Sequence, residues 1–197
     1  KLMEFILRTS FDLNAKDKYG STAWHFACKY GQTETAQLLI KSSKDFGIDL
    51  NAKDSSGWTA WHFACSNGQT ETAQLLIKSS KDIGIDLNAK TNNRMTAWHL
   101  ACEYGKTKTA HLLIKSSKEF GIDLNAKDDI GSTAWHWACR YGRTETAQLL
   151  IKSSKEFGID LNAKNDEGNT ALHLTCYNFK TETVQMILKN WKEFGID

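Results

Sequence analysis

The chain repeats itself with a fixed period, and this repetition constrains its fold more than any other feature. Thr-Ala-Trp-His-Phe-Ala-Cys at residues 22–28 recurs at 59–65 and, with small changes, at 96–102, 133–139 and 170–176. Each copy begins 37 residues after the previous one, and Asp-Leu-Asn-Ala-Lys follows the same period from residue 12. Such units fold by stacking, because each is too small to bury an apolar face alone. The sequence therefore predicts a solenoid.

The period divides residues 1–197 into a single domain of five units preceded by eleven residues. The units are 12–48, 49–85, 86–122, 123–159 and 160–196. Residues 1–11 look like the end of a preceding repeat. The last unit keeps apolar residues such as Leu188 and Trp191, whereas the outer face of a terminal cap is usually polar. We therefore expect flanking repeats in the full-length chain.

Local signals within one unit predict two helices and a turn. Thr22 can cap a first helix, whose apolar residues recur at helical spacing until Gly31 ends it. Thr33 can cap a second helix that ends before Gly47, and the polar segment ending in Gly20 suits a tight turn. The expected fold class is mainly α, a solenoid of stacked helix-turn-helix units joined by β-hairpin-like turns.

The recurring heptapeptide, with glycine three residues after it in most units, resembles the ankyrin repeat signature Thr-Pro-Leu-His-x-Ala. The resemblance covers the whole chain and implies an ankyrin-like solenoid. Two positions depart from the family pattern. Alanine stands where the family usually has proline, and tryptophan replaces leucine in four units, with leucine returning only at Leu172.

Each unit is also longer than the usual ankyrin repeat of about 33 residues. The additional four residues lie between the leucine-rich stretch of the second helix and the next aspartate. Four residues are close to one helical turn, or roughly 6 Å of helix. We therefore predict a second helix one turn longer than usual, with Phe46, Phe120 and Phe157 extending its apolar stripe.

Composition and the spacing of titratable residues argue against catalysis. Lys+Arg 25 against Asp+Glu 23 gives a charge of +2, which is too balanced to favour nucleic acid or an anionic membrane. No apolar run is long enough to insert in a membrane. One histidine recurs three residues after the threonine of each unit, and the sixth, His111, stands apart on the second helix of the third unit, so the histidines do not cluster. The resemblance implies that the recurring histidines tie the first helix to its threonine. We expect no enzyme activity, no catalytic residues, no metal and no cofactor.

The five cysteines also recur once per unit, at equivalent positions of stacked helices. Stacked helices lie about 8–10 Å apart, which exceeds the roughly 7 Å Cα separation that a disulfide permits. We therefore expect five buried, reduced thiols. Reduced cysteines favour an intracellular location, in the cytoplasm or nucleus.

Differences between units gather at the tips of the turns and on the exposed side of the first helix. The resemblance implies that these positions line a concave face that binds a partner protein. Their aromatic and arginine residues are the types that dominate interface energies. The predicted protein-binding residues are Tyr19, Lys29, Tyr30, Trp58, Asn67, Arg94, Met95, Glu103, Tyr104, Ile130, Trp137, Arg140, Tyr141 and Arg143. The partner is expected to be another protein and not a small-molecule substrate.

The third turn differs from the others because Arg94 stands where they have glycine. Glycine is the residue that adopts a left-handed conformation without strain. We expect Asn93 to take that conformation in this turn.

Other functions remain open at this stage. Lysines recur along the second helix, at Lys41, Lys44, Lys78, Lys81, Lys115, Lys118, Lys152 and Lys155. This lysine ladder could bind nucleic acid or an anionic surface, but acidic neighbours dilute it, and lysine near a helix C-terminus also complements the helix dipole. The near-identity of the units also fits a structural spacer or an engineered near-consensus array.

The resemblance further suggests a modification. An oxygen-sensing asparaginyl hydroxylase modifies some ankyrin repeats at the turn position that Asn51, Asn88 and Asn125 occupy here. The alternative role for these asparagines is a hydrogen bond to the backbone of their own turn.

Overall fold

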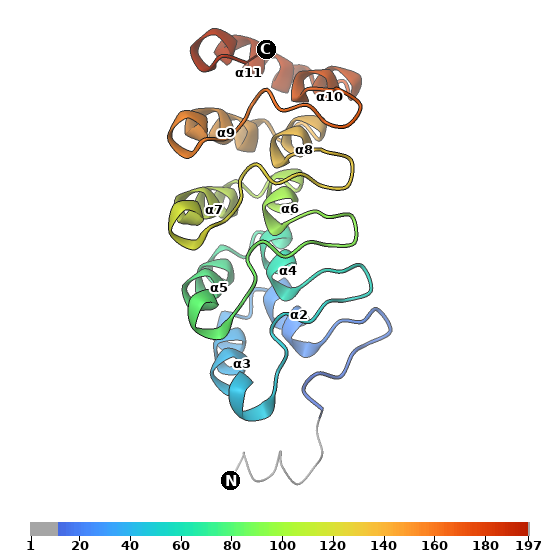
Figure 1. Ribbon diagram of the computed structural model, residues 1–197, viewed down its shortest axis with the longest axis vertical. Coiled ribbons are helices and arrows are strands. Elements are labelled where there is room, and N and C mark those ends of the chain that lie inside the picture. The colour runs from blue at the N-terminus through green and yellow to red at the C-terminus, as the bar shows by residue number, and fades with distance from the viewer. Residues whose placement is uncertain (1–11, 197) are drawn as a thin grey trace.

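The computed structural model describes residues 12–196, and within them five pairs of helices stack along one axis (Figure 1). The first helices of the pairs are α2 (Ala23–Lys29), α4 (Ala60–Asn67), α6 (Ala97–Glu103), α8 (Ala134–Arg140) and α10 (Ala171–Tyr177). The second helices are α3 (Thr33–Phe46), α5 (Thr70–Ile83), α7 (Thr107–Phe120), α9 (Thr144–Phe157) and α11 (Thr181–Phe194). The predicted mainly helical solenoid is confirmed. The expectation for residues 1–11 lies outside the described residues.

The turns between pairs project from the side of the first helices (Figure 1). No β-strand forms within residues 12–196, but each turn is closed like a hairpin. In the first turn, the backbone N–H of Asp17 donates to the carbonyl of Ser21 at 2.9 Å. Neighbouring tips are also linked, because the N–H of Ser55 donates to the carbonyl of Tyr19 at 3.0 Å. The turns therefore stack along the solenoid as the helices do.

Each first helix begins with a capping box in which histidine takes the place of the usual glutamate or glutamine. The backbone N–H of Thr22 donates to Nδ1 of His25 at 3.0 Å. Because Nδ1 accepts, the proton of the neutral ring sits on Nε2, which lies 3.1 Å from the carbonyl oxygen of Trp58 in the next turn. The role that the resemblance implied for this histidine is confirmed, and the ring also joins neighbouring units.

The second helices are one turn longer, as the sequence predicts. Helix α3 ends at Phe46, and Gly47 follows in the left-handed conformation with φ of 60°. Ile48 then donates its N–H to the carbonyl of Ser43 at 3.0 Å and buries its side chain. Phe46, Phe120 and Phe157 pack against the hydrophobic core from this added turn.

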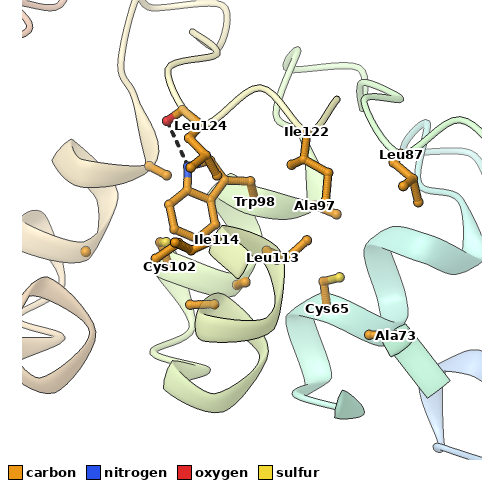
Figure 2. Packing of buried hydrophobic residues seen from close by; sticks show 14 of the residues in the cluster. Cys65, Ala73, Leu87, Ala97, Trp98, Cys102, Leu113, Ile114, Ile122 and Leu124 are labelled. Atoms are coloured by element: carbon orange, nitrogen blue, oxygen red, sulfur yellow. Dashed lines mark hydrogen bonds between the residues drawn. The ribbon is translucent and has the colours of Figure 1, made fainter. Parts of the chain in front are cut away.

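The tryptophans of the first helices form the centre of the core. Trp24, Trp61, Trp98 and Trp135 are each at most 2% exposed. The ring of Trp98 lies beside Ile114, and its Nε1–H donates to the backbone carbonyl of Leu124 at 3.0 Å (Figure 2). The other three tryptophans make the same hydrogen bond to Leu50, Leu87 and Leu161. Each indole thus joins a first helix to the turn that begins the next unit.

The cysteines follow the prediction in four units and depart from it in the fifth. Cys28, Cys65, Cys102 and Cys139 are buried free thiols, and burial raises the pKa of each well above its usual range. Cys176 is exposed, so the expectation of five buried thiols is wrong. The reason is its place on α10, because among the described residues each of the other four first helices has a following first helix packed against it and α10 has none.

Candidate protein-binding face

The residues predicted to bind a partner lie on the turn tips and on the first helices, which form one side of the solenoid (Figure 1). We call this surface the concave face. It consists of the tips at 18–21, 55–58, 92–95, 129–132 and 166–169, the exposed residues of α2, α4, α6, α8 and α10, and the short loops that follow these helices at 30–32, 68–69, 104–106, 141–143 and 178–180.

Thirteen of the fourteen predicted residues keep part of their surface in water. Exposed residues are Tyr19, Tyr30, Asn67, Arg94, Tyr104, Ile130, Tyr141 and Arg143, and half-buried ones are Lys29, Trp58, Glu103, Trp137 and Arg140. Met95 is the exception, with only 9% of its surface exposed. It directly precedes the buried capping residue Thr96, and removal of its apolar side chain from water stabilises the turn. Its assignment to the binding surface is therefore corrected.

An aromatic cluster covers the first two units. The rings of Phe26 and Tyr30 stack at 6.2 Å between centroids, and those of Trp58 and Phe63 lie 5.1 Å apart. The ammonium of Lys29 lies 5.5 Å from the ring centre of Phe63. Phe26 and Phe63 were absent from the predicted set, although both line an open pocket of about 370 Å³ here.

A second cluster lies in the fourth unit and carries two arginines. Trp137 and Tyr141 stack at 5.9 Å between ring centroids. The guanidinium of Arg140 lies 5.2 Å from the centre of the Trp137 ring, and that of Arg143 lies 5.9 Å from the Tyr141 ring. Arg143 also donates its Nε–H to the backbone carbonyl of Glu103 at 2.7 Å. The two guanidinium groups are thus held in place by aromatic faces and one backbone contact.

Asp128 fixes the orientation of the Trp137 ring. Its Oδ1 accepts the backbone N–H groups of Ile130 and Ser132, and its Oδ2 accepts the indole N–H of Trp137 at 2.7 Å. With these three donors the side chain is only 4% exposed. The sequence did not indicate this role. The equivalent aspartates of the first two turns accept the N–H groups of their own turns in the same way but have no tryptophan partner, so nothing distinguished Asp128 from them.

Glu103 and Tyr104 separate the two clusters. Burial raises the pKa of the Glu103 carboxyl, and the nearby charges of Arg143 and Arg140 partly oppose this shift. Burial also raises the pKa of the Tyr104 hydroxyl. The centre of the face thus combines a desolvated carboxyl with an aromatic hydroxyl.

The third turn contains a strained arginine. Arg94 itself has φ of 57°, so the expectation that Asn93 would take the left-handed conformation is wrong. The turn requires that conformation at this position, since Gly57 and Gly131 have φ of 78° and 73° in the neighbouring turns. A left-handed residue with a Cβ costs about 1–2 kcal/mol.

The lysine ladder has contacts of its own on the second helices. Lys81 lies 4.7 Å from the ring centre of Phe120 in the next unit. Lys115 and Lys118 both lie 5.0 Å from that of Phe157, and Lys115 also pairs with Glu156 at 3.8 Å. These contacts join successive second helices, which gives the lysines a structural role.

The side chains of the turn asparagines bond to the start of the next turn and not to the backbone of their own turn. Asn51 donates from Nδ2 to the carbonyl of Gly84 at 2.7 Å and accepts the N–H of Asp86 on Oδ1 at 3.1 Å. Asn88 and Asn125 make the equivalent pair of hydrogen bonds. The own-turn alternative is therefore wrong for these side chains. Hydroxylation of Asn51, Asn88 and Asn125 stays a prediction, and a modifying enzyme would have to open both hydrogen bonds.

Two kinds of feature are absent from the part of the chain that the structure describes. Within residues 12–196, no three His, Cys, Asp or Glu side chains lie together in a way that could hold a metal ion. In the same part of the chain, no helix is long and apolar enough to cross a membrane.

Comparison with known proteins identifies the repeat. A family model described as ankyrin repeats (3 copies) matches residues 1–91, 46–128, 81–165 and 119–197. These overlapping matches cover the whole chain. No curated protein matches the chain.

Proposed function

Because the chain belongs to the ankyrin repeat family, whose members are generally protein–protein interaction modules, we propose that it binds a partner protein through its concave face. The proposed module is non-enzymatic, and the partner contacts the turn tips and the exposed side of the first helices. Thirteen of the predicted residues form the proposed site, without Met95.

One observation carries the proposal. Most apolar side chains that recur in all or nearly all units are buried, and the recurring turn asparagines and second-helix threonines are hydrogen-bonded to a neighbouring unit, whereas the side chains that differ gather at the turn tips and on the exposed side of the first helices. Tyr30, Tyr104 and Tyr141 on this face are 40–60% exposed. Tyrosine and arginine are enriched in interface hot spots, where a large ring is removed from water at little entropic cost.

The test uses three exposed tyrosines of equivalent position and leaves the scaffold intact. The variant is Tyr30→Ala, Tyr104→Ala, Tyr141→Ala in the full chain. Trp137 is not replaced, because its loss would leave Oδ2 of the buried Asp128 without its donor. The matched control replaces exposed residues of the second helices, as Glu71→Ala, His111→Ala, Lys152→Ala.

Each chain is immobilised, the proteins that it retains from a cell lysate are quantified by mass spectrometry, and the leading candidate is purified for titration. We expect the tyrosine variant to weaken binding of that candidate at least about tenfold, with no change for the control. Equal retention by all three chains would refute the concave face as the site. It would leave a spacer, whether natural or engineered, as the better explanation.

The same titration separates the lysine ladder from the concave face. Binding through lysines to phosphates or an anionic surface weakens steeply with salt, whereas an aromatic-centred interface changes much less. A steep salt dependence together with loss of binding in the Glu71, His111, Lys152 control would favour the ladder.

Hydroxylation has its own measurement. Protein isolated from normally oxygenated cells should show a species about 16 Da heavier by intact mass if the turn asparagines are modified. Only the unmodified mass in such a sample would remove this proposal.

A further inference from the structure

Arginine and lysine occupy different parts of this molecule. Residues 12–196 contain three arginines, Arg94, Arg140 and Arg143, all on the concave face of the third and fourth units. At the positions that recur from unit to unit, the positively charged residues are lysines, as in the lysine ladder. The two side chains are not equivalent, because the planar guanidinium matches a carboxylate with two parallel hydrogen bonds whereas an ammonium acts as a point charge.

The guanidinium groups of Arg140 and Arg143 are fixed in place but not neutralised. Within residues 12–196 the one ion pair shorter than 4.0 Å joins Lys115 to Glu156 on the second helices. The half-buried carboxyl of Glu103 lies close enough for the charges of both arginines to lower its pKa against the effect of burial. Their stacking on Trp137 and Tyr141 orients the groups without satisfying their outward donors.

Arg140 also forms part of a pocket. The pocket has a volume of about 500 Å³ and lies between the fourth and fifth units. Ile130, Leu174 and Tyr177 supply apolar surface beside the guanidinium, and Glu167 is the one carboxylate among the residues that line it. A pocket of this kind admits an acidic side chain flanked by apolar residues and places its carboxylate against the arginine.

The charge on the third and fourth units of the concave face also favours an acidic segment of a partner. On the turn tips, the exposed helix sides and the residue before each second helix of the third and fourth units, four cations face two carboxylates. The cations are Arg94, Lys106, Arg140 and Arg143, and the carboxylates are Glu103 and Asp129. An acidic segment would thus meet complementary charge here, which speeds encounter and excludes basic partners.

We propose that the partner protein contacts the third and fourth units, and the pocket between the fourth and fifth, with an acidic, partly apolar segment whose carboxylates bind Arg140 and Arg143. This inference rests on the proposed function and names the chemistry of the partner at that site. Arg94, at the tip of the third turn, extends the same cationic surface.

Selection from random peptides tests the inference without a known partner. Phage displaying random peptides about a dozen residues long are selected on the full wild-type chain, on Arg140→Gln, Arg143→Gln and on Lys118→Gln, Lys155→Gln. The last variant loses the same charge from the second helices and serves as the matched control. Thermal unfolding monitored by circular dichroism confirms that all three chains are folded.

We expect Asp and Glu to be enriched over the starting library in peptides selected by the wild type and by the lysine control. The enrichment should disappear with the arginine variant. A selected peptide should bind that variant at least about tenfold more weakly than it binds the wild type. The same peptide with Asn and Gln in place of its acidic residues should bind the wild type at least about tenfold more weakly than the original peptide does. In the double-mutant cycle the two losses should not add.

The outcomes distinguish this inference from the proposed function. Peptides that need Tyr30, Tyr104 and Tyr141 but show no acidic enrichment would refute the acidic partner and leave the concave face in place. Peptides that bind independently of the tyrosines and the arginines would refute both. Failure to select any peptide would also count against both.

Discussion

The hydrogen bond of the buried indole provides the most direct test of how the units are held together. In Trp98→Phe, a ring of similar shape stays in the core, but the Nε1–H that donates to the carbonyl of Leu124 at 3.0 Å is lost. Trp98 is 1% exposed and Leu124 is 6% exposed, so water replaces that donor poorly. A buried acceptor without a partner costs about 1–3 kcal/mol. The smaller ring also leaves a cavity, which adds roughly 1 kcal/mol.

We therefore expect Trp98→Phe to lower the free energy of unfolding by about 2–4 kcal/mol. Trp191→Phe is the matched control, because Trp191 is 48% exposed and the same substitution there should change the value by less than about 0.5 kcal/mol. Urea unfolding followed by far-UV circular dichroism measures both, and an unchanged slope with denaturant shows that the comparison is valid. Equal effects of the two substitutions would refute the role assigned to the hydrogen bond.

Three further predictions concern a buried histidine, a turn asparagine and the strained arginine. Burial lowers the pKa of His62 from 6.5 to about 4, so its contribution to stability is complete above pH 6.5 and falls by about 3 kcal/mol as the pH decreases toward 4. Urea titrations at pH 7 and pH 5 should show about 2 kcal/mol of this loss, the part that falls between pH 6.5 and 5, and His62→Gln, which keeps the capping pattern, should reduce it; equal losses in both chains would contradict the assignment. Asn88→Ala should lower the unfolding free energy by about 1–2 kcal/mol, since two hydrogen bonds to the next turn are lost, whereas an unchanged melting temperature would show that water replaces them. Arg94→Gly should raise the unfolding free energy by about 1 kcal/mol in urea titration by relieving the left-handed strain, and a loss of stability would instead mean that the arginine side chain stabilises its turn.

The features of one unit could be predicted from the sequence because local chemistry determines them. Threonine and glycine mark the ends of the helices, and four additional residues before Gly47 correctly predict one more turn of helix. Contacts between units were harder to foresee, since they depend on how far each unit shifts along the next. For this reason the side-chain bonds of Asn51 to the following turn and the indole bond of Trp98 were missed.

The candidate site was also predictable from the sequence only in part. Sequence variation between units identified the exposed surface, because stacking leaves those positions unconstrained. It could not show that Met95 is buried, since three other units have a polar residue at the equivalent position. Nor could it show that Asp128 holds Trp137, because the two are nine residues apart and meet only when the turn folds back on the helix.

The stacking contacts separate residues that stabilise the solenoid from residues that bind. Thr70 and Thr109 share a hydrogen bond of 2.9 Å between α5 and α7, and equivalent threonine pairs occur at the other interfaces between second helices. Polar groups bonded in this way are not available to a partner, whereas the guanidinium of Arg140 is.

Two substitutions should therefore have opposite effects. Thr109→Val should lower the unfolding free energy by about 1 kcal/mol and leave the affinity of the folded chain for a selected peptide unchanged. Arg140→Gln should weaken that affinity and leave the unfolding free energy within about 0.5 kcal/mol of the wild type. Urea titration and fluorescence anisotropy on the same preparations measure both quantities. If either substitution changed stability and affinity together, stacking and binding would share residues, and the concave face could not vary independently of the scaffold.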